Sequence, residues 1–172
     1  MKRVILALLF MLLPAVCYAD AVHDVMIALK HLEGVTTYGT SYQDYASYLE
    51  EAKSEVDLYL KGDEAKQHEK LTVTISELMG LYELADPLFR RLPDSNGFMN
   101  IGADASPMDK KIASEYFSRF PQDKKDVAKG GVLKKGVKLH LKSAITKIFK
   151  RASAKYAEAV KMLNQTGPSL VP

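Results

Sequence analysis

Four histidines have the side chains best suited to catalysis or metal binding, but they are dispersed along the sequence. They are His23, His31, His68 and His140. No two are four residues apart, and neither His-Glu-x-x-His nor Glu-x-x-His occurs, so the sequence predicts no metal site and no cofactor. No Gly-x-Ser-x-Gly elbow and no glycine-rich phosphate loop is found either. The sequence therefore gives no support for an enzyme.

Tyrosines at helical spacing form a second group. They are Tyr38, Tyr42, Tyr45 and Tyr48, with Tyr59 further along. Tyr42, Tyr45 and Tyr59 coincide with an apolar stripe, where a tyrosine packs its ring in the core and keeps its hydroxyl at the edge. Tyr38 precedes the helix and Tyr48 lies at the edge of the stripe. These two residues, together with Phe98, are therefore the candidate ligand contacts.

A long basic segment is the third chemical feature. No acidic residue lies between Asp126 and Glu158. On a helical wheel most of the cations in this interval fall opposite the apolar stripe of Leu141, Ile145 and Ile148. We therefore predict a basic amphipathic helix that contacts an anionic partner. Its predicted contacts are Lys138, Lys142, Lys147, Lys150, Arg151 and Lys155.

Three interpretations of the basic helix remain open. Its cations could be a solvated face that pairs weakly with the acidic helix at residues 41–60. They could bind an anionic membrane surface or an acidic protein. They could also mediate self-association. Nucleic acid is not expected, because the cations are almost all lysine and no aromatic residues are interleaved with them. Heme is not expected either, since the chain lacks the cysteine motif for covalent attachment.

Charge is strongly polarised along the chain, although the formal net charge of the 172 residues is only +3. Residues 20–105 contain 7 basic and 16 acidic side chains, for a net charge of −9. Residues 106–172 contain 15 basic and 5 acidic side chains, for a net charge of +10. The near-neutral total thus conceals an acidic front half and a basic final part.

The elements that carry these residues are predicted to be helices almost throughout. Apolar residues recur at helical spacing from residue 22 to residue 32, with Asp20 as the N-cap and Gly34 as the stop. Ser41 opens a second helix, which ends at Gly62. A third begins near Asp63, and Pro87 is expected to kink it or stop it early.

The second half of the chain continues this pattern after a turn-rich loop at residues 93–105. Ser106 is predicted to cap a helix that Pro121 ends. A polar segment follows, and the last helix starts at Val137 and is closed by Gly167. Only residues 131–139 could instead form a strand. We therefore predict an all-α fold, a bundle of four to five amphipathic helices.

The first 19 residues are predicted to be a secretory signal peptide. Lys2 and Arg3 precede an apolar stretch at residues 4–16, which is shorter than the roughly 20 residues that span a bilayer. The segment Cys17-Tyr18-Ala19 supplies small cleavage-site residues. Lipidation of Cys17 is the less favoured alternative, because Val16 and Pro14 fit a lipoprotein signal poorly. The protein is therefore expected to be periplasmic or extracellular.

These observations predict one helical-bundle domain at residues 20–166, with no transmembrane helix, followed by a disordered tail at 167–172. The folded part contains no cysteine, which excludes disulfides and thiol chemistry there. We expect an exported, non-catalytic binding or interaction module. The alternative is a small-ligand carrier or enzyme with a pocket between the tyrosine-rich helix and the 93–105 loop.

Overall fold

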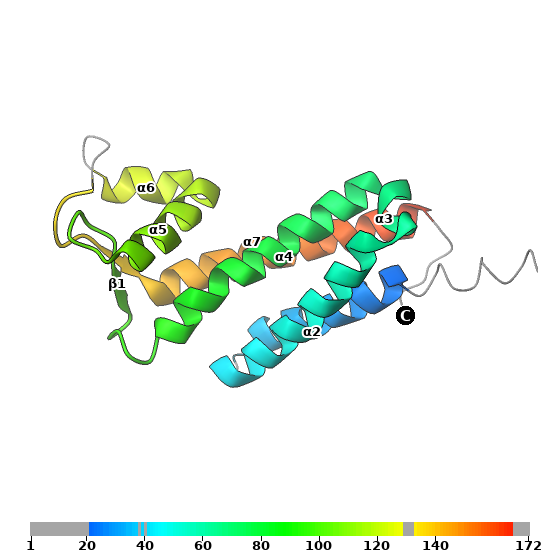
Figure 1. Ribbon diagram of the computed structural model, residues 1–172, viewed down its shortest axis with the longest axis horizontal. Helices are drawn as coiled ribbons and strands as arrows, with labels where there is room; N and C mark the ends of the chain where they lie inside the picture. The colour runs from blue at the N-terminus through cyan, green and yellow to red at the C-terminus, as the bar shows by residue number, and fades with distance from the viewer. Residues whose placement is uncertain (1–20, 38, 40, 129–132, 167–172) are drawn as a thin grey trace, which may run out of the picture. The chain divides into compact units, whose positions relative to one another are not determined.

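The computed structural model describes residues 21–37, 39, 41–128 and 133–166, which are mostly helical (Figure 1). The predicted all-α class is confirmed, with one small two-stranded sheet among these residues. The predicted signal peptide, Cys17, Tyr38 and the C-terminal tail lie outside the described residues.

The chain divides into two compact units, which are described separately. Unit 1 contains the described residues up to Met79 and from Ala152 onward, and unit 2 is Gly80–Arg151. Two long helices, α4 (Glu69–Arg91) and α7 (Leu141–Thr166), supply residues to both units. A single domain at 20–166 remains a prediction.

Unit 1 consists of helices only, among its described residues. Besides its parts of α4 and α7, it contains a helix at residues 21–37, α2 (Tyr42–Lys61) and α3 (Asp63–Gln67). The predicted cap of α2 is present, because the Ser41 hydroxyl accepts a hydrogen bond from the Asp44 amide at 3.1 Å. The predicted apolar stripes of the first two helices are largely buried. Their buried members are Val22, Val25, Met26, Leu29, Leu32, Tyr45, Leu49, Ala52, Val56 and Tyr59.

Two predictions for unit 1 were wrong. Gly34 does not end the first helix, which continues to residue 37. A glycine inside a helix costs only about 1 kcal/mol, and the Thr36 hydroxyl adds a hydrogen bond to the Glu33 carbonyl at 2.8 Å. Tyr42, predicted to pack its ring in the core, is only partly buried.

The third predicted helix is also interrupted, at His68, which separates α3 from α4. The Thr72 hydroxyl bridges the break by donating to the Ala65 carbonyl oxygen at 2.7 Å. Pro87 does not stop α4 early, because the helix runs on to Arg91. A proline so near the end of a helix removes one backbone hydrogen bond and leaves the rest intact.

Unit 2 contains the rest of α4 and α7 together with α5 (Pro107–Arg119) and α6 (Pro121–Val127). The Ser106 hydroxyl caps α5 as predicted, accepting from the Asp109 amide at 3.1 Å. α5 ends before Pro121, and this proline then begins α6. Phe117 and the other apolar side chains on one face of α5 are buried.

The sheet of unit 2 corrects the predicted loop at 93–105 and the predicted start of the last helix, and its second strand overlaps the end of the segment at 131–139 for which a strand was the open alternative. The loop at 93–105 contains strand β1 (Phe98–Asn100), and the segment just before α7 is strand β2 (Lys138–His140). The strands are antiparallel, with Met99 opposite Leu139. α7 therefore begins at Leu141 instead of Val137, and Lys138 lies on a strand. Three-residue strands are too short to show an alternating pattern that competes with helical periodicity.

Candidate functional site

Three of the six predicted basic contacts are occupied by partners inside the fold. The best fixed is Lys147 on α7, whose Nζ lies 2.8 and 2.9 Å from the two carboxylate oxygens of Asp123 on α6. The buried Tyr116 hydroxyl on α5 donates to the same carboxylate. Burial alone would raise the pKa of Asp123, but the hydrogen bonds from Lys147 and Tyr116 outweigh it and lower the pKa. Burial and the Asp123 carboxylate raise the pKa of Tyr116.

Lys155 and Arg151 are the other two occupied cations. In unit 1, the Lys155 Nζ lies 2.7 Å from Glu77 and 3.0 Å from Glu158. In unit 2, Arg151 donates from Nη1 to the backbone carbonyl of Arg119 at 2.6 Å. These interactions connect α7 to neighbouring helices, so we interpret the two side chains as stabilising the fold.

The remaining three predicted contacts, Lys138, Lys142 and Lys150, are exposed, and their side-chain ammonium groups make no hydrogen bond or ion pair with any described residue. Lys142 and Lys150 lie two helical turns apart on α7, with Thr146 midway between them. Residues at four-residue spacing share one face of a helix. The free cations therefore form a short row on α7, together with Lys138 on the preceding strand.

An exposed aromatic ring lies on the same sheet as Lys138. Phe98 is 45% exposed, pairs with His140 in the strand register, and has its ring centroid 5.0 Å from that of His140. Directly opposed residues of an antiparallel pair project from the same face. Asn100 is opposite Lys138, so Phe98, His140 and Lys138 share the outer face of the sheet. The Nδ1 of His140 also accepts a hydrogen bond from the Ser143 amide at 3.2 Å, which caps the start of α7.

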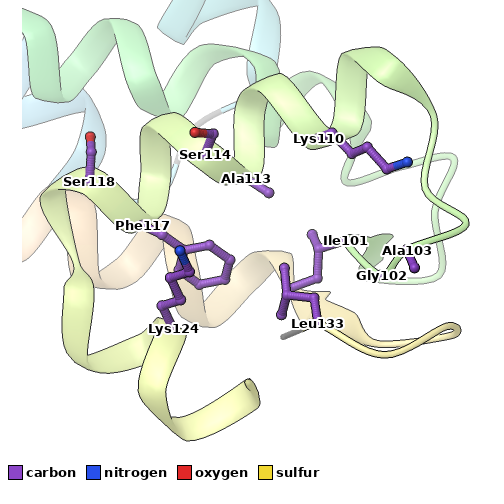
Figure 2. Close-up of a pocket in the computed structure, with 10 residues that line it drawn as sticks. All are labelled: Ile101, Gly102, Ala103, Lys110, Ala113, Ser114, Phe117, Ser118, Lys124 and Leu133. Atoms are coloured by element: carbon purple, nitrogen blue, oxygen red, sulfur yellow. The ribbon is translucent and has the colours of Figure 1, made fainter. Parts of the chain in front are cut away.

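A pocket of about 480 Å³ opens on unit 2 beside α5 (Figure 2). Its apolar lining includes Ile101, Ala113 and Phe117, and two lysines, Lys110 and Lys124, lie around it. The other lining residues are Gly102, Ala103, Ser114, Ser118 and Leu133. The pocket therefore combines an apolar floor with two cations.

One wall of this pocket is fixed by two turns that lie against each other. A side chain at Gly102 would place Cβ 2.4 Å from the Lys134 carbonyl oxygen, so only glycine fits there. Gly136, at a φ of 75°, donates its amide to the Asp104 carboxylate at 2.9 Å. This hydrogen bond lowers the pKa of Asp104. The wall is thus held by contacts between two turns that are distant in sequence.

Sequence reasoning missed this pocket. Helices α5 and α6 supply six of its ten lining residues, but the rest come from the loop at 93–105 and from residue 133, segments without helical periodicity. The available signal was a pair of adjacent lysine doublets, at residues 110–111 and 124–125, on either side of the apolar residues of α5.

The predicted ligand contacts Tyr48 and Phe98 belong to different units, and each lines a pocket of its own unit. Tyr48 lies beside His31, with ring centroids 6.2 Å apart, and His31 Nδ1 lies 3.8 Å from a Glu51 carboxylate oxygen. Phe98 lines its pocket with Arg90. The predicted pocket between the tyrosine-rich helix and the 93–105 loop remains a prediction.

The described parts of the chain contain no group of three or more histidine, cysteine, aspartate or glutamate residues that could hold a metal ion. None of the described helices is both long and apolar enough to cross a membrane. Comparisons with protein-family profiles, curated proteins and solved structures found no match to this chain. Function must therefore be inferred from the geometry of two features of unit 2, the exposed lysines near the start of α7 and the pocket beside α5.

Proposed function

We propose that this protein is an exported, non-catalytic helical bundle of four to five main helices whose unit 2 contacts an anionic membrane surface. One observation carries the proposal: Lys138, Lys142 and Lys150 are exposed, and their side-chain ammonium groups have no partner among the described residues. Their charges are therefore available to a partner outside the described residues. An acidic protein is the alternative partner.

The charge of unit 2 supports this proposal. Its sequence, Gly80–Arg151, contains 15 basic and 8 acidic residues, for a net charge of +7. Each lysine close to an anionic lipid surface contributes about 1 kcal/mol of binding free energy. Three free lysines therefore supply about 3 kcal/mol, and the exposed ring of Phe98 on the same sheet face as Lys138 adds an apolar contact at the headgroup level.

Binding to lipid vesicles with and without phosphatidylglycerol, measured across a salt series, tests the contact. The test variant is Lys138→Gln/Lys142→Gln/Lys150→Gln, and the control is Lys30→Gln/Lys61→Gln/Lys161→Gln, which removes the same charge from exposed positions of unit 1. We expect the test variant to lose about 100-fold in affinity for anionic vesicles and the control to lose far less. Equal losses in both variants, or no binding by the unaltered protein, would overturn the membrane contact.

Export is proposed from the sequence of the first 19 residues and has its own test. Mass spectrometry of the protein recovered from a secreting host should give a chain that begins at Asp20. A lipid adduct on Cys17 would show instead that the protein is an anchored lipoprotein. A chain that keeps Met1 and stays in the cytoplasm would overturn export.

A further inference from the structure

We propose that the pocket on unit 2 binds a single-chain anionic amphiphile, with the apolar chain against Phe117 and the anionic head at Lys110 or Lys124. This inference does not depend on the proposed membrane contact, because Lys138, Lys142 and Lys150 do not line the pocket.

The floor of the pocket accounts for the apolar half of the ligand. Ile101, Ala113 and Phe117 are 1%, 3% and 5% exposed, so they belong to the core of unit 2 and still border the hollow. Figure 2 shows Ile101, Phe117 and Leu133 around a common space. The volume of about 480 Å³ falls within the range of about 300–1,000 Å³ that small-ligand sites occupy. An alkyl chain placed there would lie against apolar side chains.

The lysines account for the anionic half. Lys110 comes from α5 and Lys124 from α6, both are exposed, and neither forms an ion pair within the described structure. In Figure 2 they lie on opposite sides of the apolar side chains. The Ser118 hydroxyl, also on the lining, already donates to the Glu115 carbonyl at 2.7 Å. The ammonium groups are therefore the charged donors available to a carboxylate or phosphate head, beside the Ser114 hydroxyl.

The pocket is also held in shape before any ligand arrives. On one side, Gly102 lies against the backbone of Lys134. On the other, Asp123, the residue before Lys124, is anchored by Tyr116 and Lys147. A site that is already ordered loses less conformational entropy when it binds. The wall at Gly102 and the backbone next to Lys124 are therefore held in place before a ligand binds.

Isothermal titration calorimetry of the chain that begins at Asp20, with probes kept monomeric, tests the ligand class. Dodecanoate and dodecyl phosphate carry the two anionic heads that these lysines would accept, and they distinguish a fatty acid from a phosphate ester. Dodecyl maltoside has the same chain without charge, and acetate has the charge without the chain. We expect saturable one-to-one binding of at least one anionic probe and binding at least about tenfold weaker for both controls. Equal affinity for dodecyl maltoside, or no binding of either anion, would overturn the proposal.

Neighbouring lysines give a matched control for the site. Lys110→Gln/Lys124→Gln should weaken binding of the anionic probe about tenfold or more. Lys111→Gln/Lys125→Gln removes the same charge from adjacent exposed positions that do not line the pocket, and should leave affinity within about twofold. Equal effects of the two double variants would show that the probe responds to overall charge, which contradicts a site in this pocket.

A third variant tests the cavity itself and the independence of the two proposals. Ala103 is exposed and lines the pocket, so Ala103→Trp places a large side chain there without disturbing the core. This variant should keep the wild-type thermal unfolding and lose probe binding; retained binding would contradict the location. Lys138→Gln/Lys142→Gln/Lys150→Gln should bind the probe like the unaltered protein. Loss of probe binding in that variant would place the site on the membrane-contact lysines instead of this pocket.

Discussion

At the level of single residues, the helical wheel separated core tyrosines from surface ones. Tyr45 and Tyr59 are buried and Tyr48 is 36% exposed, as their positions on the stripe predicted, whereas Tyr42 is only partly buried. The wheel gave no information on partners. The Tyr59 hydroxyl lies 2.9 Å from the Thr72 hydroxyl on α4, 13 residues away, and a contact between two helices leaves no trace in the periodicity of either one.

The hydroxyls of Tyr59 and Tyr48 should therefore differ in what they contribute to stability. Tyr59→Phe leaves its ring buried but removes the hydrogen bond to Thr72, so we expect a loss of about 0.5–1.5 kcal/mol in the free energy of unfolding. Tyr48→Phe changes an exposed hydroxyl and should stay within about 0.5 kcal/mol. Urea unfolding of both variants checks this. Equal losses would mean that the Tyr59–Thr72 contact contributes nothing.

The ionised carboxylate of Asp123 stabilises the fold through its contacts with Lys147 and Tyr116. In the folded protein its pKa is held below the ordinary value of 3.8, chiefly by Lys147 and Tyr116 acting against the effect of burial. The stabilisation that the ionised Asp123 carboxylate provides is therefore complete at pH values above its ordinary pKa. It is lost as the pH falls through the lower pKa of the folded protein. We expect Asp123→Asn to lower the free energy of unfolding by about 1–3 kcal/mol at neutral pH.

The same variant should be less sensitive to acid than the unaltered protein, because the ionisation that acid reverses is already absent. The control is Asp126→Asn, which changes an exposed carboxylate on the same helix. Urea unfolding at pH 7 and pH 3 provides both comparisons. If Asp126→Asn destabilised the protein as much as Asp123→Asn, the three-residue network would have no special role.

At the level of elements, the sequence predicted what local chemistry decides. Ser41 and Ser106 cap their helices as expected. Each hydroxyl accepts a hydrogen bond from an amide only three residues later, so the cap depends on local sequence alone. The start of α7 was misplaced, because β2 forms through pairing with a strand about 40 residues earlier. The pocket escaped prediction for the same reason, since its wall is made by turns distant in sequence.

Substitutions at two glycines, one in a local helical setting and one in a non-local contact, should change the free energy of unfolding in opposite directions. Gly34 lies inside the first helix, and a side chain there would meet nothing within 4 Å, so Gly34→Ala should raise the free energy of unfolding by about 0.5–1 kcal/mol. Gly102→Ala should lower it by about 1–3 kcal/mol, because its Cβ would collide with the Lys134 backbone. Thermal unfolding checks both signs. A destabilising Gly34→Ala would indicate that the helix needs glycine there.

At the level of the whole molecule, the structure changes where the charge asymmetry lies. The sequence placed it between a front half of −9 and a back half of +10. In the structure, the described residues of unit 1 contain 7 basic and 12 acidic residues, for a net charge of −5, and the described residues of unit 2 contain 14 basic and 8 acidic residues, for a net charge of +6. The end of α7, with Lys155 paired to Glu77, belongs to the acidic unit. The positive surface therefore belongs to unit 2 and not to α7 as a whole, and the sequence could not show which lysines are paired.

This distribution predicts that the free lysines cost stability while the paired one provides it. In unit 2, Lys138, Lys142 and Lys150 repel other cations of the unit and gain no partner in return, so Lys138→Gln/Lys142→Gln/Lys150→Gln should raise the free energy of unfolding by about 0.5 kcal/mol at low salt.

The gain should vanish as salt is added, because the Debye length falls from about 30 Å at 0.01 M to about 3 Å at 1 M. Lys147→Gln should be destabilising at both salt concentrations, since it breaks a contact with a carboxylate that is only 18% exposed. Urea unfolding at the two concentrations measures these effects. A loss of stability in the triple variant would mean that these lysines support the fold, and their exposure would then no longer argue for an anionic partner. A gain at low salt, together with weaker vesicle binding, would show that the protein keeps these charges at a cost to its own stability, which is what a binding surface requires.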